Sequence, residues 1–223
     1  MSAAAENKLS PCYTLISMLF MGDFDLTRML LLILAFVAAI AVHEANHALV
    51  ATLLGDDTPR RHGRLSLNPL RHIDPMGLLV FVLAGIGWGW TPVNPRNLRP
   101  NPRIGNAIVA AAGPLANLVL AVLLSLPLRA ELAMPLLLQQ FLFVAAALNL
   151  LLFVFNLIPI PPLDGFTVLL GLLPAHLARV VQQLERVGPG LILAFLFLPS
   201  FFHVNVVRMI YSPVARVFGF PGL

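Results

Sequence analysis

Three long apolar stretches limit what this 223-residue chain can fold into. They occupy about residues 29–54, 104–128 and 132–158; the first contains three ionisable side chains and the other two contain none. Each is long enough to cross a bilayer as a helix, which takes about 20 apolar residues. The composition agrees, because 11% of the residues are charged, against about 25% in a soluble domain. We therefore predict an all-α polytopic membrane protein.

Shorter segments complete the predicted topology. Residues 11–21 and 77–87 are apolar but too short to cross, so we expect a membrane-surface segment and a re-entrant segment. Arg64–Leu67 alternates polar and apolar residues, as a short strand does. Gly85–Trp90 contains too much glycine for a stable helix. These features predict short re-entrant or β-hairpin elements, and a further membrane segment is expected at about residues 188–211.

Arginines between the first and second apolar stretches indicate the orientation in the membrane. Seven of them lie in residues 56–103, and Arg and Lys accumulate in the cytoplasmic loops of membrane proteins. We therefore expect this region on the cytoplasmic side of the cell membrane, where the first and third spans would both end. Membrane topology also explains the net charge of +4, because the arginines lie between the apolar spans. We therefore expect the lipid bilayer, and no nucleic acid, as a partner. The one cysteine, Cys12, excludes a disulfide within the chain.

A His-Glu-x-x-His pattern lies inside the first apolar stretch, at residues 43–47. Residues four apart share one face of a helix, so the imidazoles of His43 and His47 can bind one metal ion. Glu44 projects beside that ion and can take a proton from a water molecule there. Ionisable groups at membrane depth are costly and are usually functional. The pattern therefore indicates a metal site with an adjacent general base.

A catalytic zinc site normally has three protein ligands, and this chain offers few candidates for the third. Apart from Glu44, Asp164 is the only acidic residue expected near the membrane interior. It follows Pro159–Pro162, where proline at three of four positions prevents an α-helix. Because the first and third spans both end in the cytoplasm, His47 and Asp164 should both lie toward the cytoplasmic side. The alternative is that Asp164 caps a helix beginning at Gly165.

Together these motifs resemble those of the site-2 protease family of intramembrane metalloproteases. The matching segments are the His43–His47 pattern, Gly113-Pro114-x-x-Asn117, and Asn156-Leu157-Ile158-Pro159 through Leu163-Asp164-Gly165. Loops at residues 67–75 and 92–95 resemble those of compact prokaryotic members. The resemblance implies a three-helix catalytic core at about residues 29–170. We expect residues 1–223 to form a single membrane-embedded protease domain without a PDZ or CBS domain.

The resemblance also implies the chemistry of the site. One Zn²⁺ would be held by His43, His47 and Asp164, with Glu44 as the general base. Asn156 matches the family's motif asparagine and can donate a hydrogen bond to the substrate carbonyl as charge develops on its oxygen. The alternative for its side chain is a hydrogen bond between helices.

The implied substrates are membrane-spanning segments of other proteins, cleaved in regulated intramembrane proteolysis or in clearance of signal-peptide remnants. Because a helix shields its own peptide bonds, the substrate must unwind near the cut. Gly85–Trp90 and Arg64–Leu67 are candidates to pair with the unwound segment as an added strand; a plain re-entrant turn is the alternative. Whether the protein forms a homo-oligomer is left open.

Two other functions compete with this interpretation. A zinc carrier or a catalytically silent membrane scaffold would need no base at Glu44. A thermolysin-type site would take a later glutamate as its third ligand, but Glu131 is expected on the opposite side and Glu185 in a polar loop. The remaining polar residues are assigned to structure: His62 and His72 to solvent-facing loops, and Asn117 and Asn149 to helix packing.

Overall fold

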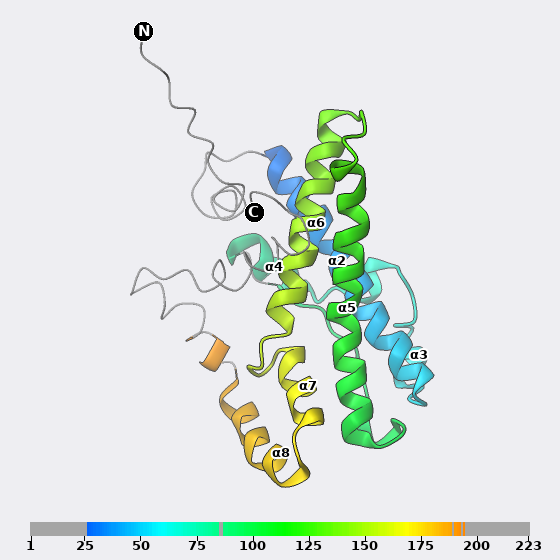
Figure 1. Cartoon of the computed structure of the whole chain (residues 1–223), viewed down its shortest axis with the longest axis vertical. Coiled ribbons are helices and arrows are strands. Elements are labelled where there is room, and N and C mark those ends of the chain that lie inside the picture. The colour runs from blue at the N-terminus through cyan, green and yellow to red at the C-terminus, as the bar shows by residue number, and fades with distance from the viewer. Residues whose placement is uncertain (1–25, 85–86, 189, 193, 195–223) are drawn as a thin grey trace.

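Three long helices form the body of the computed structural model, which describes residues 26–84, 87–188, 190–192 and 194. They are α2 (Leu26–Leu53), α5 (Pro102–Arg129) and α6 (Leu136–Asn156). Each is long and apolar enough to cross a membrane. In Figure 1, α2 and α6 both run toward the lower end of the molecule, and α5 runs the opposite way. The prediction of a helical protein with several membrane spans is confirmed.

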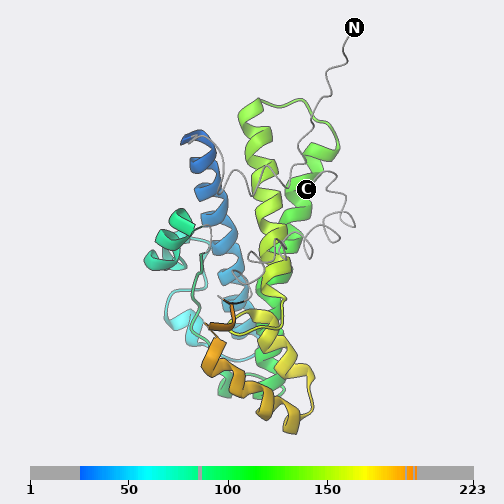
Figure 2. The same ribbon diagram turned by 90° about the vertical axis from the view of Figure 1, so that its left-hand side faces the viewer.

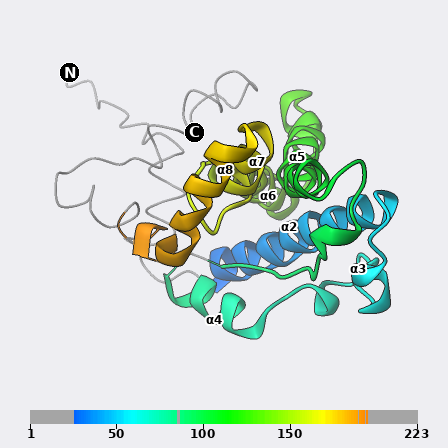
Figure 3. The same ribbon diagram turned by 90° about the horizontal axis from the view of Figure 1, so that it is seen from below.

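Short helices surround this body. They are α3 (Thr58–Arg61), α4 (Pro75–Ala84), α7 (Asp164–Leu172), α8 (Ala175–Val181), η1 (Pro69–Arg71), η2 (Pro95–Asn97) and η3 (Gln182–Val187). Figures 2 and 3 show α3 and α4 on one flank of α2, with α5 to α8 on the other flank. The α2 helix therefore lies in the middle of the structure, covered from two sides.

Alanine lines the contacts between the long helices. Seven alanines are completely buried there: Ala35, Ala39, Ala48 and Ala51 of α2, Ala121 of α5, and Ala146 and Ala147 of α6. Helices in lipid gain little from the hydrophobic effect when they associate, so they depend on close van der Waals packing between small side chains. These alanines let the backbones approach, which brings side chains of all three helices into one polar centre.

The α4 helix is attached to α2 through aromatic rings. Phe36 of α2 and Phe81 of α4 stack with their ring centroids 3.8 Å apart. A Cβ atom at Gly87 would overlap the Phe36 ring and lie 2.8 Å from the Phe81 Cβ atom, so this position accommodates only glycine. Other apolar side chains of α4, such as Leu83, are exposed. A membrane-dipping role for this half-length helix stays a prediction.

Asp56 is fully buried and holds the segments that follow α2 and precede α5 together. Its Oδ1 atom accepts hydrogen bonds from the Thr58 backbone N–H, the Thr58 hydroxyl and the Asn97 amide, and its Oδ2 accepts from the Asn94 N–H at 2.7 Å. Burial opposes ionisation of this carboxyl, but the hydrogen bonds outweigh it and lower its pKa. Asp56 thus joins the corner after α2 to the segment that leads into α5.

Two predictions for the loop between α2 and α4 are wrong. Arg64–Leu67 forms bends instead of a strand, because Ser66 makes local bonds: its hydroxyl accepts from the Asn68 N–H at 3.0 Å, and its carbonyl accepts from His72 Nε2 at 2.5 Å. His72 is fully buried, not exposed to solvent. Within the described ranges no β-strand is assigned; an isolated antiparallel bridge joins Ile73 to Gly89.

Three predicted features fall outside the described residues, wholly or in part. They are the apolar segment at residues 11–21, most of the membrane segment at about 188–211, and the first two residues of Gly85–Trp90.

Candidate metal centre

The two histidines of α2 lie on its buried face, and each ring is held by an oxygen atom of α5. His43 Nδ1 lies 2.5 Å from the Asn117 side-chain Oδ1, and His47 Nδ1 lies 2.7 Å from the Val109 carbonyl oxygen. Both partners are acceptors, so each imidazole must donate its proton from Nδ1. In a neutral ring Nε2 then carries a bare lone pair.

These two bare nitrogen atoms face each other. The distance between His43 Nε2 and His47 Nε2 is 3.0 Å, and the rings meet edge to face with centroids 4.6 Å apart. Neither nitrogen can donate to the other while its proton is on Nδ1. Two lone pairs at hydrogen-bond distance repel each other unless a cation lies between them, and a bound metal ion meets this requirement.

Asp164 reaches the histidines from the far side of the proline-rich break. Its Oδ2 atom lies 3.1 Å from His43 Nε2 and 3.4 Å from His47 Nε2. Among the described residues this buried oxygen has no hydrogen-bond donor. The capping alternative is wrong, because Leu163 occupies the N-cap position of α7 and Asp164 is the first helical residue. A carboxylate oxygen and two imidazole nitrogens therefore converge on one point.

Local sequence explains how Asp164 arrives there. The α6 helix ends at Asn156, and the prolines that follow cannot continue it. A Cβ atom at Gly165 would overlap the backbone of Leu157 and lie 2.7 Å from the Ile158 carbonyl oxygen. The glycine therefore lets α7 start directly against the end of α6, which aims the first side chain of α7 at α2.

The space between the three ligand atoms fits a tetrahedral zinc ion. Ligands about 2.0–2.1 Å from such an ion lie about 3.3 Å apart, and the observed separations are 3.0, 3.1 and 3.4 Å. Gly113 of α5 keeps this space open: a Cβ atom there would overlap His47 Nε2 and lie 2.7 Å from His43 Nε2. His43, His47 and Asp164 can together hold a metal ion.

Glu44 is buried beside this cluster and is covered by an extended segment. Residues 87–91, here called the strap, cross α2 at this point. A Cβ atom at Gly89 would lie 2.6 Å from Glu44 Cγ and 2.7 Å from Glu44 Oε1. The Thr91 hydroxyl donates to the Glu44 carbonyl oxygen at 3.1 Å. The carboxylate is therefore enclosed by protein, and its contact with Gly89 is one that sequence patterns did not reveal.

Two asparagines make hydrogen bonds that the sequence did not predict, while the catalytic role of Asn156 stays a prediction. Asn156 donates its amide to the Leu152 carbonyl oxygen, one turn back in its own helix, at 3.0 Å. This is not the bond between helices considered as its alternative, and no described contact joins Asn156 to the three ligands. Asn117 joins α5 to α2 and α6, as expected for a packing residue, and it also accepts the His43 Nδ1 proton. Its position one turn after Gly113 was the available signal, because both residues then face α2.

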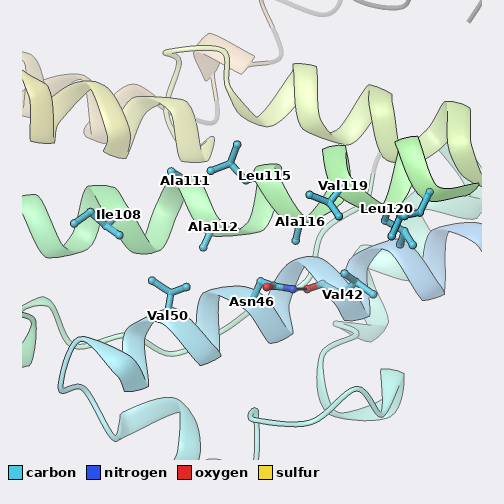
Figure 4. A pocket seen from close by; sticks show the side chains of 11 residues that line it. Val42, Asn46, Val50, Ile108, Ala111, Ala112, Leu115, Ala116, Val119 and Leu120 are labelled. Atoms are coloured by element: carbon cyan, nitrogen blue, oxygen red, sulfur yellow. Dashed lines mark hydrogen bonds between the residues drawn. The ribbon is translucent and has the colours of Figure 1, made fainter. Parts of the chain in front are cut away.

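A separate apolar groove of about 660 Å³ lies between α2 and α5. Figure 4 shows Val42, Asn46 and Val50 of α2 facing Ile108, Ala112 and Ala116 of α5 across it. Asn46 donates to the Val42 carbonyl oxygen within its own helix. The groove has no titratable side chain in its lining, so the chemistry belongs to the cluster on the neighbouring face.

Comparisons with known proteins agree with this geometry. The family model described as "Peptidase family M50" matches residues 128–198, which contain α6, α7 and Asp164. The chain is 38% identical to "Putative zinc metalloprotease YwhC" of Bacillus subtilis, over 74% of this chain and 79% of that protein. No solved structure matches it.

Mycobacterial relatives extend the similarity. The chain is 32% identical to "Putative zinc metalloprotease Rip2" of Mycolicibacterium smegmatis, over 87% of this chain and 75% of the relative. It is 30% identical to the protein of the same name from Mycobacterium tuberculosis, over 76% and 68%. With its membrane-spanning helices and its three converging ligands, the chain belongs to peptidase family M50, the site-2 protease family, and is a zinc metalloprotease.

Proposed function

We propose that His43, His47 and Asp164 hold one zinc ion and that the site hydrolyses peptide bonds in or near membrane-spanning segments of other proteins. The observation that carries this proposal is the convergence of three ligand atoms at 3.0–3.4 Å. Bound zinc supplies a Lewis acid that lowers the pKa of a water molecule to about 7 and polarises the scissile carbonyl. Three protein ligands leave a fourth position for that chemistry.

Glu44 acts as the general base. It is one residue from His43 on the same helix, and it is buried against the strap, away from bulk water. It accepts the proton of the attacking water and returns it to the leaving nitrogen. Asn156 donates a hydrogen bond to the substrate carbonyl oxygen in our proposal. This requires its amide to turn away from the Leu152 carbonyl that it now contacts.

The strap is the proposed docking edge for an unwound substrate. It is held to the loop before α4 by the Ile73–Gly89 bridge and by the Trp90 N–H, which donates to the His72 carbonyl at 3.3 Å. The Arg64 guanidinium lies over the Trp90 ring, 5.2 Å from its centroid. A strap fixed in this way next to Glu44 can offer its backbone to an extended peptide. Arg64–Leu67 does not pair with the substrate in this proposal, because it is not a strand.

The site opens toward the cytoplasm in this proposal. Nine described arginines lie between α2 and α5, in the first turn of α5, or in the segments after α6: Arg60, Arg61, Arg64, Arg71, Arg96, Arg99, Arg103, Arg179 and Arg186. Arg28 and Arg129 lie toward the other ends of α2 and α5. This imbalance favours the arginine-rich end on the cytoplasmic side. Asp164 begins the helix that follows the descending α6, so the metal ligands lie toward that end.

Glu44→Gln tests the proposal against a zinc carrier or a silent scaffold. Purified wild type and variant are reconstituted in lipid vesicles with a membrane-spanning peptide, and zinc content and cleavage are measured. A protease variant keeps its zinc and loses cleavage by at least about 100-fold, as expected for removal of a general base. Asp57→Asn, at an exposed carboxylate of the α2–α3 corner, is the control and cleaves normally. Equal cleavage by wild type and Glu44→Gln contradicts the proposal.

A further inference from the structure

A chain of buried amides connects α6 to the metal site through α5. Asn149 donates to the Ala145 carbonyl oxygen at 2.8 Å and accepts from the Asn117 amide at 2.7 Å. Asn117 in turn accepts from His43 Nδ1. The two asparagine side chains are at most 1% exposed, so water does not replace these partners. Three helices thus contribute to one linear path that ends at a metal-facing imidazole.

The direction of every hydrogen bond in this path follows from its far end. The Ala145 carbonyl can only accept, so Asn149 must turn its amide nitrogen toward it. Asn149 Oδ1 then faces Asn117, which must donate a hydrogen bond to it from its amide nitrogen. Asn117 Oδ1 is then presented to His43, and only an N–H on Nδ1 satisfies it. A second, longer bond from the Asn117 nitrogen to the Ala39 carbonyl, at 3.3 Å, favours the same orientation.

The geometry points to Asn149 as a positioning residue: it orients the Asn117 amide so that His43 keeps its proton on Nδ1 and presents a bare Nε2 to the metal. This inference rests on the proposed role of His43 as a zinc ligand. Asn149 itself hydrogen-bonds to Asn117 and Ala145, and among the described residues no hydrogen bond joins it to His43, His47 or Asp164. Without its acceptor, the Asn117 amide can turn over, and its nitrogen then faces His43 Nδ1. The imidazole proton moves to Nε2, where the ion must bind.

Two substitutions of Asn149 distinguish an effect of the Asn117 amide orientation from an effect of lost packing. Asn149→Leu removes the acceptor, whereas Asn149→Asp keeps an oxygen for the Asn117 amide whether or not the carboxyl is protonated. Zinc affinity is measured on the purified full chain in detergent by competition with a chelator. The ring-nitrogen NMR shifts of His43 in the zinc-free protein report which nitrogen carries the proton. Ser125→Ala is the control. It removes a buried polar group of α5 that bonds only within its own helix in the described structure.

We expect Asn149→Leu to weaken zinc binding about 10–100-fold, the usual effect of losing a partner behind a histidine ligand, and to move the His43 proton to Nε2. Asn149→Asp and Ser125→Ala keep both properties close to wild type. Wild-type zinc affinity in a folded Asn149→Leu variant overturns the inference. Equal losses in the Leu and Asp variants also overturn it, because they assign the effect to packing.

A double-substitution cycle separates the orienting role of Asn149 from the packing loss that Asn149→Leu also causes. Asn117→Asp offers His43 an acceptor oxygen in either orientation, so it makes the orienting role of Asn149 unnecessary. In that background Asn149→Leu has no further effect on zinc affinity, whereas additive losses contradict the inference. His43→Ala tells the two proposals apart: unchanged zinc binding in that variant refutes the ligand set itself, not only the role of Asn149.

Discussion

The metal centre and the apolar groove are both built between α2 and α5, one residue apart along each helix. Val42 and Asn46 line the groove, while the next residues, His43 and His47, face the metal position. On α5, Ala112 lines the groove and Gly113 faces the two imidazoles. One residue turns a helix by about 100°. That rotation alone separates a polar reaction site from an apolar surface made by the same two helices.

The two regions also differ in how tightly their side chains are constrained. In the metal centre each histidine has a specified partner, and the space beside the imidazoles is closed to a Cβ atom at Gly113. In the groove, the Asn46 amide donates to the Val42 carbonyl oxygen of its own helix, and side chains such as Ile108 are partly exposed. Substitutions of similar size should therefore have very different effects on zinc binding and cleavage in the metal centre and in the groove.

The largest effect is expected from Gly113→Ala. The added methyl group overlaps both Nε2 atoms, so the imidazoles must move from the positions in which they can hold an ion. Zinc affinity should fall by more than about 100-fold, at the upper end of what altered metal surroundings produce, and cleavage should fall with it. Metal analysis after dialysis against a weak chelator measures the change.

Ala112→Val is the matched control on the neighbouring residue, because its methyl groups project into the groove. It should retain wild-type zinc content. If both variants lose zinc equally, the contrast between the two faces is wrong.

Gly89→Ala should have the next largest effect. Its methyl group meets Glu44 Cγ and Oε1 at 2.6 and 2.7 Å, so either the strap or the carboxylate must shift. Displacement of a catalytic group by about 1 Å can cost about 100-fold in rate. Zinc content should stay normal, because the atoms nearest to the added methyl group belong to Glu44 and Ile40 and not to the three ligands. Single-turnover cleavage in vesicles, with zinc measured on the same sample, tests this; loss of zinc would instead place the strap among the elements that support the metal.

Asp56→Asn changes a buried polar group outside the metal centre. Its hydrogen bonds are expected to contribute to stability and not to zinc binding. The amide cannot accept all of the bonds that the carboxylate accepts from Thr58, Asn94 and Asn97, so unfolding should become easier by about 1–3 kcal/mol. Zinc content of the folded variant should be unchanged. Thermal unfolding in detergent at pH 7 measures the difference. An unchanged midpoint would show that the hydrogen bonds of Asp56 contribute nothing to stability.

The same carboxylate predicts a pH dependence. Its pKa in the folded protein is lowered, so the unfolded state binds the proton more tightly. The resulting stability is present above the unfolded pKa, about 3.9, and is lost as the pH falls below it toward the folded pKa. The stability gap between wild type and Asp56→Asn should therefore narrow below about pH 4. A gap that widens in acid would contradict this sign.

The smallest effect is expected from Ile108→Ala at the edge of the groove. The side chain is 43% exposed and has no part in the metal centre. Stability should change by no more than about 0.5 kcal/mol, the usual range for surface positions, with zinc content and cleavage unchanged. Thermal unfolding and cleavage of the same peptide test it; a large loss of cleavage would mean that the groove takes part in substrate binding.

The sequence alone predicted the three spans, the histidine pair and the break before Asp164. Those features depend on composition and on local helix geometry, since apolar length, four-residue spacing and proline each act within a short segment. Local patterns failed where a distant contact decided the outcome. Arg64–Leu67 had the alternation of a strand but no partner strand, and His72 stood among arginines yet is buried.

The tertiary structure decided which atoms of those residues face the metal and what surrounds them. Asn117 and Val109 set the proton positions on the imidazoles, Gly113 keeps the cavity open, and the strap encloses Glu44. Such relationships join side chains more than 40 residues apart, and no short-range pattern encodes them. Residue types and helical spacing determined what this protein can bind, whereas the packing of α2 against α5, α7 and the strap determined the geometry in which it does so.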